Sequence, residues 1–165
     1  MKALMRHRLF WPIVALLALI AINTIARPQF ILVTLRDGEL YGALIDILRN
    51  SAPLMLVALG MTIVIATRGI DLSVGAIMAV SGAVALTIID GSPDPGNLGT
   101  VAVAHLVALA VSLVLGAWNG FLVAVVGIQP IIATLVLMLA GRGMALLITE
   151  GFITTVNSAA YEFLA

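Results

Sequence analysis

The sequence predicts an all-α protein: a polytopic bundle of about five transmembrane helices. Hydrophobic residues make up 62% of its 165 residues and charged residues only 10%. The mean hydropathy is +1.22, and the apolar residues gather into five long runs separated by short polar breaks. A water-soluble domain needs more polar residues than this to cover its surface. We therefore expect the lipid bilayer to surround the chain, with its backbone groups paired inside helices.

The first apolar run, residues 9–26, follows a basic segment that contains Lys2, Arg6 and Arg8. This arrangement is typical of a signal peptide, with 24–26 as a cleavage site, or of a retained signal anchor. The further apolar runs favour the retained anchor. Positive charge before a first span favours a cytoplasmic N-terminus.

Four further runs, 52–67, 74–89, 101–126 and 131–149, predict the remaining helices. A bilayer core about 30 Å thick needs about 20 helical residues. The runs 52–67 and 74–89 have 16 residues each, which would reach roughly 24 Å. One or both are therefore incomplete crossings, or they borrow residues from their flanks.

Two connections between the runs have characteristic compositions. Segment 90–100 has no basic residue and is rich in turn formers, as expected of an external loop. Within the 27–50 connection, Leu44, Ile47 and Leu48 are spaced to share one helix face. We expect a short interfacial helix over 41–48.

The break Arg68-Gly-Ile-Asp-Leu-Ser73 separates the second run from the third. Glycine allows the backbone to turn, and Asp71 or Ser73 can accept hydrogen bonds from the first amides of the next helix. One interpretation is a simple helix cap. The other is a structured break beside a transport cavity, because irregular backbone at membrane depth occurs where it lines water or protein.

Small residues in the third and fourth runs predict close helix packing. Gly75, Ala79 and Ala83 are four residues apart, and the fourth run contains Gly116-Ala-Trp118-Asn119-Gly. The alternative is that Trp118 and Asn119 line a substrate path. An indole beside an amide would suit stacking on a sugar ring and hydrogen bonding to its hydroxyls.

Gln129 and Arg142 complete the set of candidate residues. Gln129 lies in a tight connection just before Pro130, where proline suits the first position of a helix. Arg142 lies well inside an apolar run and needs a partner or water. Both structural pairing with another helix and exposure to a polar cavity remain open for Arg142.

Composition also excludes several functions. Eight basic and eight acidic residues cancel, so no net field attracts nucleic acid. The chain has no cysteine, its two histidines, His7 and His105, lie in different segments, and it has no phosphate-binding Gly-x-x-x-x-Gly-Lys loop. We expect no cofactor, no metal site and no enzymatic activity, including no ATP hydrolysis by this chain.

Two blocks carry a resemblance to a known family. Segment 58–75, ALGMTIVIATRGIDLSVG, and segment 118–143 resemble the permease subunits of bacterial ribose-type ABC sugar importers. With Ile148-Thr149 and Asn157-Ser158, the second block is most similar to the galactofuranose branch. The resemblance runs from about residue 37 to residue 158.

The resemblance implies a multi-pass permease of the bacterial inner membrane that imports a monosaccharide. Its implied partners are a second permease copy, an ATP-binding cassette ATPase and a periplasmic sugar-binding protein. Members of the family continue through a second hydrophobic half, so we interpret residues 1–165 as the N-terminal half of a permease domain. The alternative function is a non-transporting, truncated membrane scaffold or assembly fragment. The candidate residues for a substrate pathway or structural break are Asp71, Ser73, Trp118, Asn119, Gln129 and Arg142.

Overall fold

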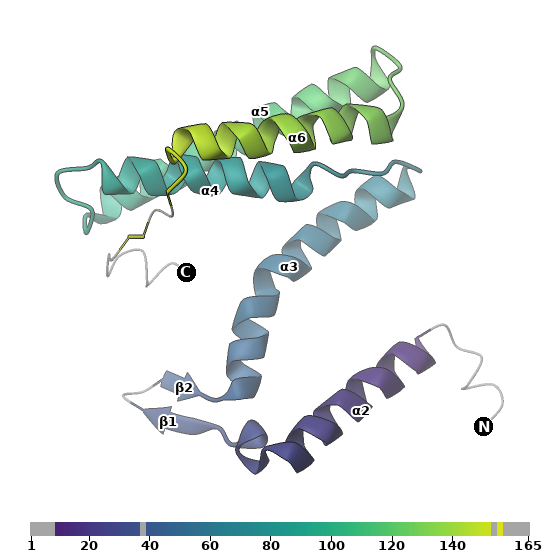
Figure 1. The fold of residues 1–165 in the computed structure, drawn as a ribbon, viewed down its shortest axis with the longest axis vertical. Coiled ribbons are helices and arrows are strands. Elements are labelled where there is room, and N and C mark those ends of the chain that lie inside the picture. Colours follow the sequence, from purple (N-terminus) through teal and green to yellow (C-terminus); the bar gives the residue numbers. More distant parts are fainter. Residues whose placement is uncertain (1–8, 37–38, 153–154, 157–165) are drawn as a thin grey trace. The chain divides into compact units, whose positions relative to one another are not determined.

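The computed structural model describes residues 9–36, 39–152 and 155–156. The chain divides into two compact units, Met1–Ala58 and Leu59–Ala165, and the division falls within helix α3 (Figure 1). Five α-helices account for the five apolar runs. The all-α fold class is therefore confirmed for the part of the chain that the structure describes.

Among the described residues of the first unit, the first helix is α2 (Phe10–Ala26), close to the predicted bounds of the first run. A short 3-10 helix, η1 (Pro28–Ile31), follows. Strands β1 (Thr34–Arg36) and β2 (Glu39–Tyr41) then form an antiparallel hairpin in which Leu35 pairs with Leu40. This hairpin was not predicted, because three-residue strands are too short to produce a recognisable alternation of polar and apolar residues.

Helix α3 (Ala43–Ala66) corrects the prediction for the second span. The short interfacial helix expected over 41–48 is instead the beginning of this longer helix, and Tyr41 ends strand β2. The helix continues through Pro53, which removes only one intrahelical hydrogen bond because proline lacks a backbone N–H. Its 24 residues reach roughly 36 Å, so the second span borrows its missing length from the N-terminal flank.

The second unit contains α4 (Val74–Asp90), α5 (Leu98–Ala124) and α6 (Pro130–Ile148). Helix α4 lies alongside both α5 and α6 (Figure 1). Helix α5 begins three residues before the predicted run, because the Asn97 side-chain oxygen accepts a hydrogen bond from the Gly99 amide at 2.7 Å and caps the helix. Pro130 opens α6, as predicted.

The apolar core of this unit lies where α4 meets α5. Ile89 of α4 packs with Val101 and Ala104 of α5, and all three are fully buried. Most other large apolar side chains of the described residues are exposed, including Leu56 of α3 and Leu113 of α5. Such a surface is unfavourable in water and suits contact with lipid.

Within the described residues, α3, α5 and α6 are long and apolar enough to cross a membrane. Helices α2 and α4 are apolar but have 17 residues each, about 25 Å of helix. The third span therefore remains short, in contrast to the second.

The close approach of helices occurs at a different place from the one predicted. Ala83 is buried, but Gly75 and Ala79 are exposed. Instead, Gly141 of α6 lies against Ala76 of α4, and a Cβ atom added at Gly141 would stand 3.0 Å from the Ala76 Cβ. Ala83 of the predicted stripe is thus on the packed face of α4, whereas Gly75 and Ala79 are not, and their neighbours Ala76 and Val80 are buried instead.

Substituting Gly141 tests this contact. Gly141→Leu should destabilise the protein by about 1–3 kcal/mol, because the added side chain forces α6 away from α4. Gly143→Leu is the matched control on the same helix, since among the described residues nothing apart from its chain neighbours and its own helix backbone lies within 4 Å of its Cβ position. Thermal unfolding of the purified protein in detergent would measure both. Equal losses in the two variants would contradict the packing.

Candidate functional site

The break between α3 and α4 begins with a tight helix ending. The Arg68 amide donates to the Ile65 carbonyl at 2.9 Å, and the Gly69 amide donates to the Val64 carbonyl at 3.0 Å. This pair of bonds defines a Schellman motif, whose central residue adopts a left-handed conformation. Arg68 occupies that position with φ of 61°, where glycine is usually preferred. The chain therefore leaves α3 through a sharp, strained turn.

Asp71 and Ser73 are joined directly after this turn. One Asp71 carboxylate oxygen, Oδ1, accepts from the Ser73 amide at 2.7 Å and from the Ser73 hydroxyl at 2.6 Å. Ser73 is the residue before α4, but its side chain makes no capping hydrogen bond to the helix. The expected capping role therefore falls only to Asp71, which accepts the amide just before the helix begins.

Asn119 of α5 connects to the same pair. Its side-chain Nδ2 donates to the Ser73 hydroxyl oxygen at 2.9 Å. Ser73 is fully buried, and Asn119 is 6% exposed. The other atom of the amide, Oδ1, is buried and has no hydrogen-bond partner among the described residues. Three of the predicted candidate residues thus form one chain of hydrogen bonds, Asn119 to Ser73 to Asp71, which is buried at Asn119 and Ser73 and half-buried at Asp71.

Thr134 of α6 brings a third helix to the break. Its hydroxyl lies 2.8 Å from the Pro130 carbonyl oxygen and 3.4 Å from the Ile70 carbonyl oxygen, and the side chain is 4% exposed. Thr134 was not among the candidate residues predicted from the sequence. A lone hydroxyl in an apolar run, one helical turn after the proline that opens α6, could have indicated it.

A cavity of about 200 Å³ lies beside the break. Its walls come from the end of α3, the break itself, α5 and α6. The polar groups among its lining residues include the side chains of Thr67, Asp71, Asn119 and Thr134. The polar break therefore adjoins a partly open cavity within the second unit, which supports the interpretation of a structured break over that of a simple cap.

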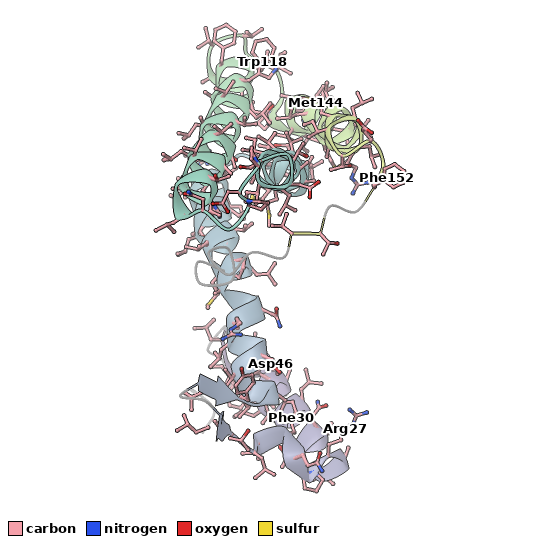
Figure 2. The ribbon with its side chains drawn as sticks, turned by 90° about the vertical axis from the view of Figure 1, so that its left-hand side faces the viewer. Arg27, Phe30, Asp46, Trp118, Met144 and Phe152 are labelled. Atoms are coloured by element: carbon pink, nitrogen blue, oxygen red, sulfur yellow. The ribbon has the colours of Figure 1, made fainter. Side chains whose placement is uncertain are left out.

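The structure does not bring Trp118, Gln129 or Arg142 to this cavity. Trp118, labelled in Figure 2, is 54% exposed on α5. Its ring stacks on that of Phe121, with the ring centroids 6.2 Å apart. Gln129 is exposed just before α6, and its side chain makes no capping hydrogen bond. Arg142 is exposed on α6. A pathway role for these three residues stays a prediction.

A second cavity, of about 440 Å³, lies at the far ends of α4 and α6. Its lining includes Asp90, Glu150 and Phe152, the last of which Figure 2 labels beyond the end of α6. Glu150 has φ of 52° and ends α6 in the same left-handed manner as Arg68 ends α3.

Comparison with known proteins identifies similar chains. Residues 43–164 match the family described as the permease component of branched-chain amino acid transport systems. The chain is 48% identical over 160 residues to the galactofuranose transporter permease protein YtfT of Escherichia coli K12, covering 93% of this chain and 45% of that protein. No solved structure matches the chain.

Two further relatives are also named as sugar permeases. The fructose import permease protein FruF of Bifidobacterium longum is 44% identical over 161 residues, which cover 96% of this chain and 44% of that protein. The ribose import permease protein RbsC of Escherichia coli K12 is 40% identical over 139 residues, covering 84% and 39%. The chain thus spans less than half the length of these relatives.

Removing the central hydroxyl tests the buried hydrogen-bond chain. Ser73→Ala should destabilise the protein by about 1–3 kcal/mol, because it leaves the buried Asn119 amide group without its acceptor. Ser112→Ala is the matched control on α5, since the Ser112 hydroxyl bonds only to the Ala108 carbonyl of its own helix. Unfolding in detergent micelles would compare the two. If the control lost as much stability as Ser73→Ala, the hydrogen bond between Ser73 and Asn119 would contribute no more to stability than a bond within one helix.

Glycine at the left-handed positions tests the strain at the helix ends. Arg68→Gly and Glu150→Gly should each raise stability by about 1 kcal/mol, because the left-handed conformation is costly for residues other than glycine. The measurement is the thermal midpoint of each purified variant. A fall in both midpoints would show that the side chains contribute more than the backbone strain costs.

Proposed function

The chain belongs to the family of permease components described for branched-chain amino acid transport systems, and we propose that it is a permease subunit of an ATP-driven sugar importer. In this role the helices form part of the translocation pathway across the membrane. The observation that carries the proposal is the 48% identity over 160 residues to a galactofuranose transporter permease.

The proposed cargo is a monosaccharide. Although the family description refers to branched-chain amino acids, relatives are named for galactofuranose, fructose, ribose and xylose. Galactofuranose or a ribose-like sugar is favoured among these. A neutral sugar also agrees with a chain whose basic and acidic residues cancel, because a neutral cargo needs no charged pathway to attract it.

The location proposed for the subunit is the inner membrane of a bacterium. Three described helices are long and apolar enough to span it, and exposed apolar side chains cover much of their surface. The basic residues Lys2, Arg6 and Arg8 favour a cytoplasmic N-terminus. Residues 1–165 would then form the N-terminal half of the permease domain.

The proposed partners follow from the transport role. The energy would come from an ATP-binding cassette ATPase that is a separate subunit. A periplasmic binding protein would deliver the sugar, and a second permease copy would complete the pathway. ATP binding and hydrolysis in the partner would shift the permease between inward-open and outward-open states.

Reconstitution tests this function. The protein that contains residues 1–165 is placed in liposomes with its ATPase and binding protein, and uptake of labelled monosaccharides is followed with and without ATP. We expect ATP-dependent uptake of a monosaccharide and no uptake of leucine or valine. The control is an ATPase subunit that binds but does not hydrolyse ATP. Accumulation of a branched-chain amino acid instead of sugar would overturn the proposal.

A further inference from the structure

We propose that the cavity beside the break binds a hydroxyl group, which donates its proton to Asn119 Oδ1 and lies beside the Asp71 carboxylate. The identification of this hydroxyl as part of a sugar rests on the proposed function. The need for a hydrogen-bond donor at this position does not rest on it, because that need follows from the direction of the hydrogen bonds around Ser73.

The Ser73 hydroxyl fixes the orientation of the Asn119 amide. A carboxylate has no proton to give, so the 2.6 Å contact requires Ser73 to donate to Asp71. A hydroxyl has only one proton, and therefore Ser73 can only accept from Asn119. The amide must present Nδ2 to Ser73, and its carbonyl oxygen cannot exchange places with that nitrogen.

The carbonyl oxygen of Asn119 is consequently a buried acceptor that needs a donor. It has no partner among the described residues, although the Asn119 side chain is buried, with only 6% exposed. Native proteins leave few buried polar atoms unpaired, and such exceptions indicate a missing water or ligand. Since Asn119 lines the cavity, the cavity is the place from which a donor can reach it.

The other polar side chains on the cavity wall also present acceptors. The Thr67 hydroxyl donates to the Val64 carbonyl at 2.8 Å, and the nearest acceptor of the Thr134 hydroxyl is the Pro130 carbonyl at 2.8 Å. Their oxygens, with those of Asp71 and Asn119, therefore remain as acceptors. A phosphate or carboxylate would be repelled by this wall, whereas a group with an O–H can donate to it.

The size of the cavity allows two sources for the hydroxyl. Its volume of about 200 Å³ is several times the roughly 30 Å³ that one water occupies in the liquid. An ordered water, or one hydroxyl of a transported sugar, therefore fits the chemistry. The two sources predict different effects of an Asn119 substitution on the affinity for sugar.

Sugar-induced thermal stabilisation of the purified full-length permease separates the sources. If a sugar hydroxyl is the donor, Asn119→Leu should weaken sugar binding roughly tenfold or more, equivalent to the loss of one good hydrogen bond. One monodeoxy analogue should bind the wild type as weakly as the parent sugar binds the variant. Asn23→Leu is the matched control, since Asn23 is exposed on α2 and its Nδ2 donates to the Leu19 carbonyl of its own helix.

If water is the donor, sugar binding is the same in the wild type and in Asn119→Leu. Hydroxyl-radical labelling of the cavity residue Val123 should then fall severalfold in the variant, because the water has lost its acceptor. Unchanged sugar binding together with unchanged labelling would overturn the proposal. Stabilisation by sodium, potassium or ammonium chloride that disappears in Asn119→Leu would also overturn it, in favour of a cation site.

Asp71→Asn keeps the test decisive if Asn119→Leu does not fold. The substitution preserves an oxygen to accept from Ser73 and replaces the second carboxylate oxygen by an N–H donor, so hydroxyl binding should weaken while the fold remains. The measurements of sugar binding and of Val123 labelling described for Asn119→Leu are then made on Asp71→Asn, and the same results support or overturn the proposal. Failure of the proposed function is recognised separately, as a wild-type protein that transports no sugar while the labelling of Val123 still depends on Asn119.

Discussion

The whole structure depends on the requirement that polar groups in hydrocarbon find partners inside the protein. Regular helices meet this requirement for the backbone, since every interior N–H and C=O pairs within its own segment. The requirement is hardest to meet at the break between α3 and α4, where the chain is irregular. There Asp71 accepts from Ser73, Ser73 accepts from Asn119, and Thr134 approaches Ile70 from α6. At this break, side chains supply the hydrogen-bond partners that a continuous helix would have supplied.

The sequence predicted the helical class and the approximate place of all five helices, because long apolar runs are a strong signal. It placed the second helix wrongly at its N-terminal end. The polar residues that precede Ala52 were taken as the end of the apolar run, whereas α3 starts at Ala43 and includes them. The contact of Gly141 with Ala76 was missed for another reason: which face of α4 meets α6 is decided by tertiary packing, not by the spacing of small residues alone.

The candidate site was predictable in part. Asp71 and Ser73 lie two residues apart in an unusual polar break, and the sequence predicted that either could accept hydrogen bonds there. Asn119 was recognised as a polar residue in an apolar run. Their meeting depends on a contact between residues 46 positions apart, which local patterns do not encode. Trp118 was grouped with Asn119 because the two are neighbours, yet consecutive helix residues point in different directions, and Trp118 is exposed while Asn119 is buried.

The long-range bond to Ser73 also constrains the order in which the protein matures. Synthesis proceeds from the N-terminus, so Ser73 leaves the ribosome 46 residues before Asn119, and Ile70 precedes Thr134 by 64. While α3 and α4 are already entering the membrane, the peptide between them still lacks the partners that later hold it. The polar groups of that junction therefore need water or the insertion machinery as partners until α5 and α6 have been synthesised and can form these hydrogen bonds.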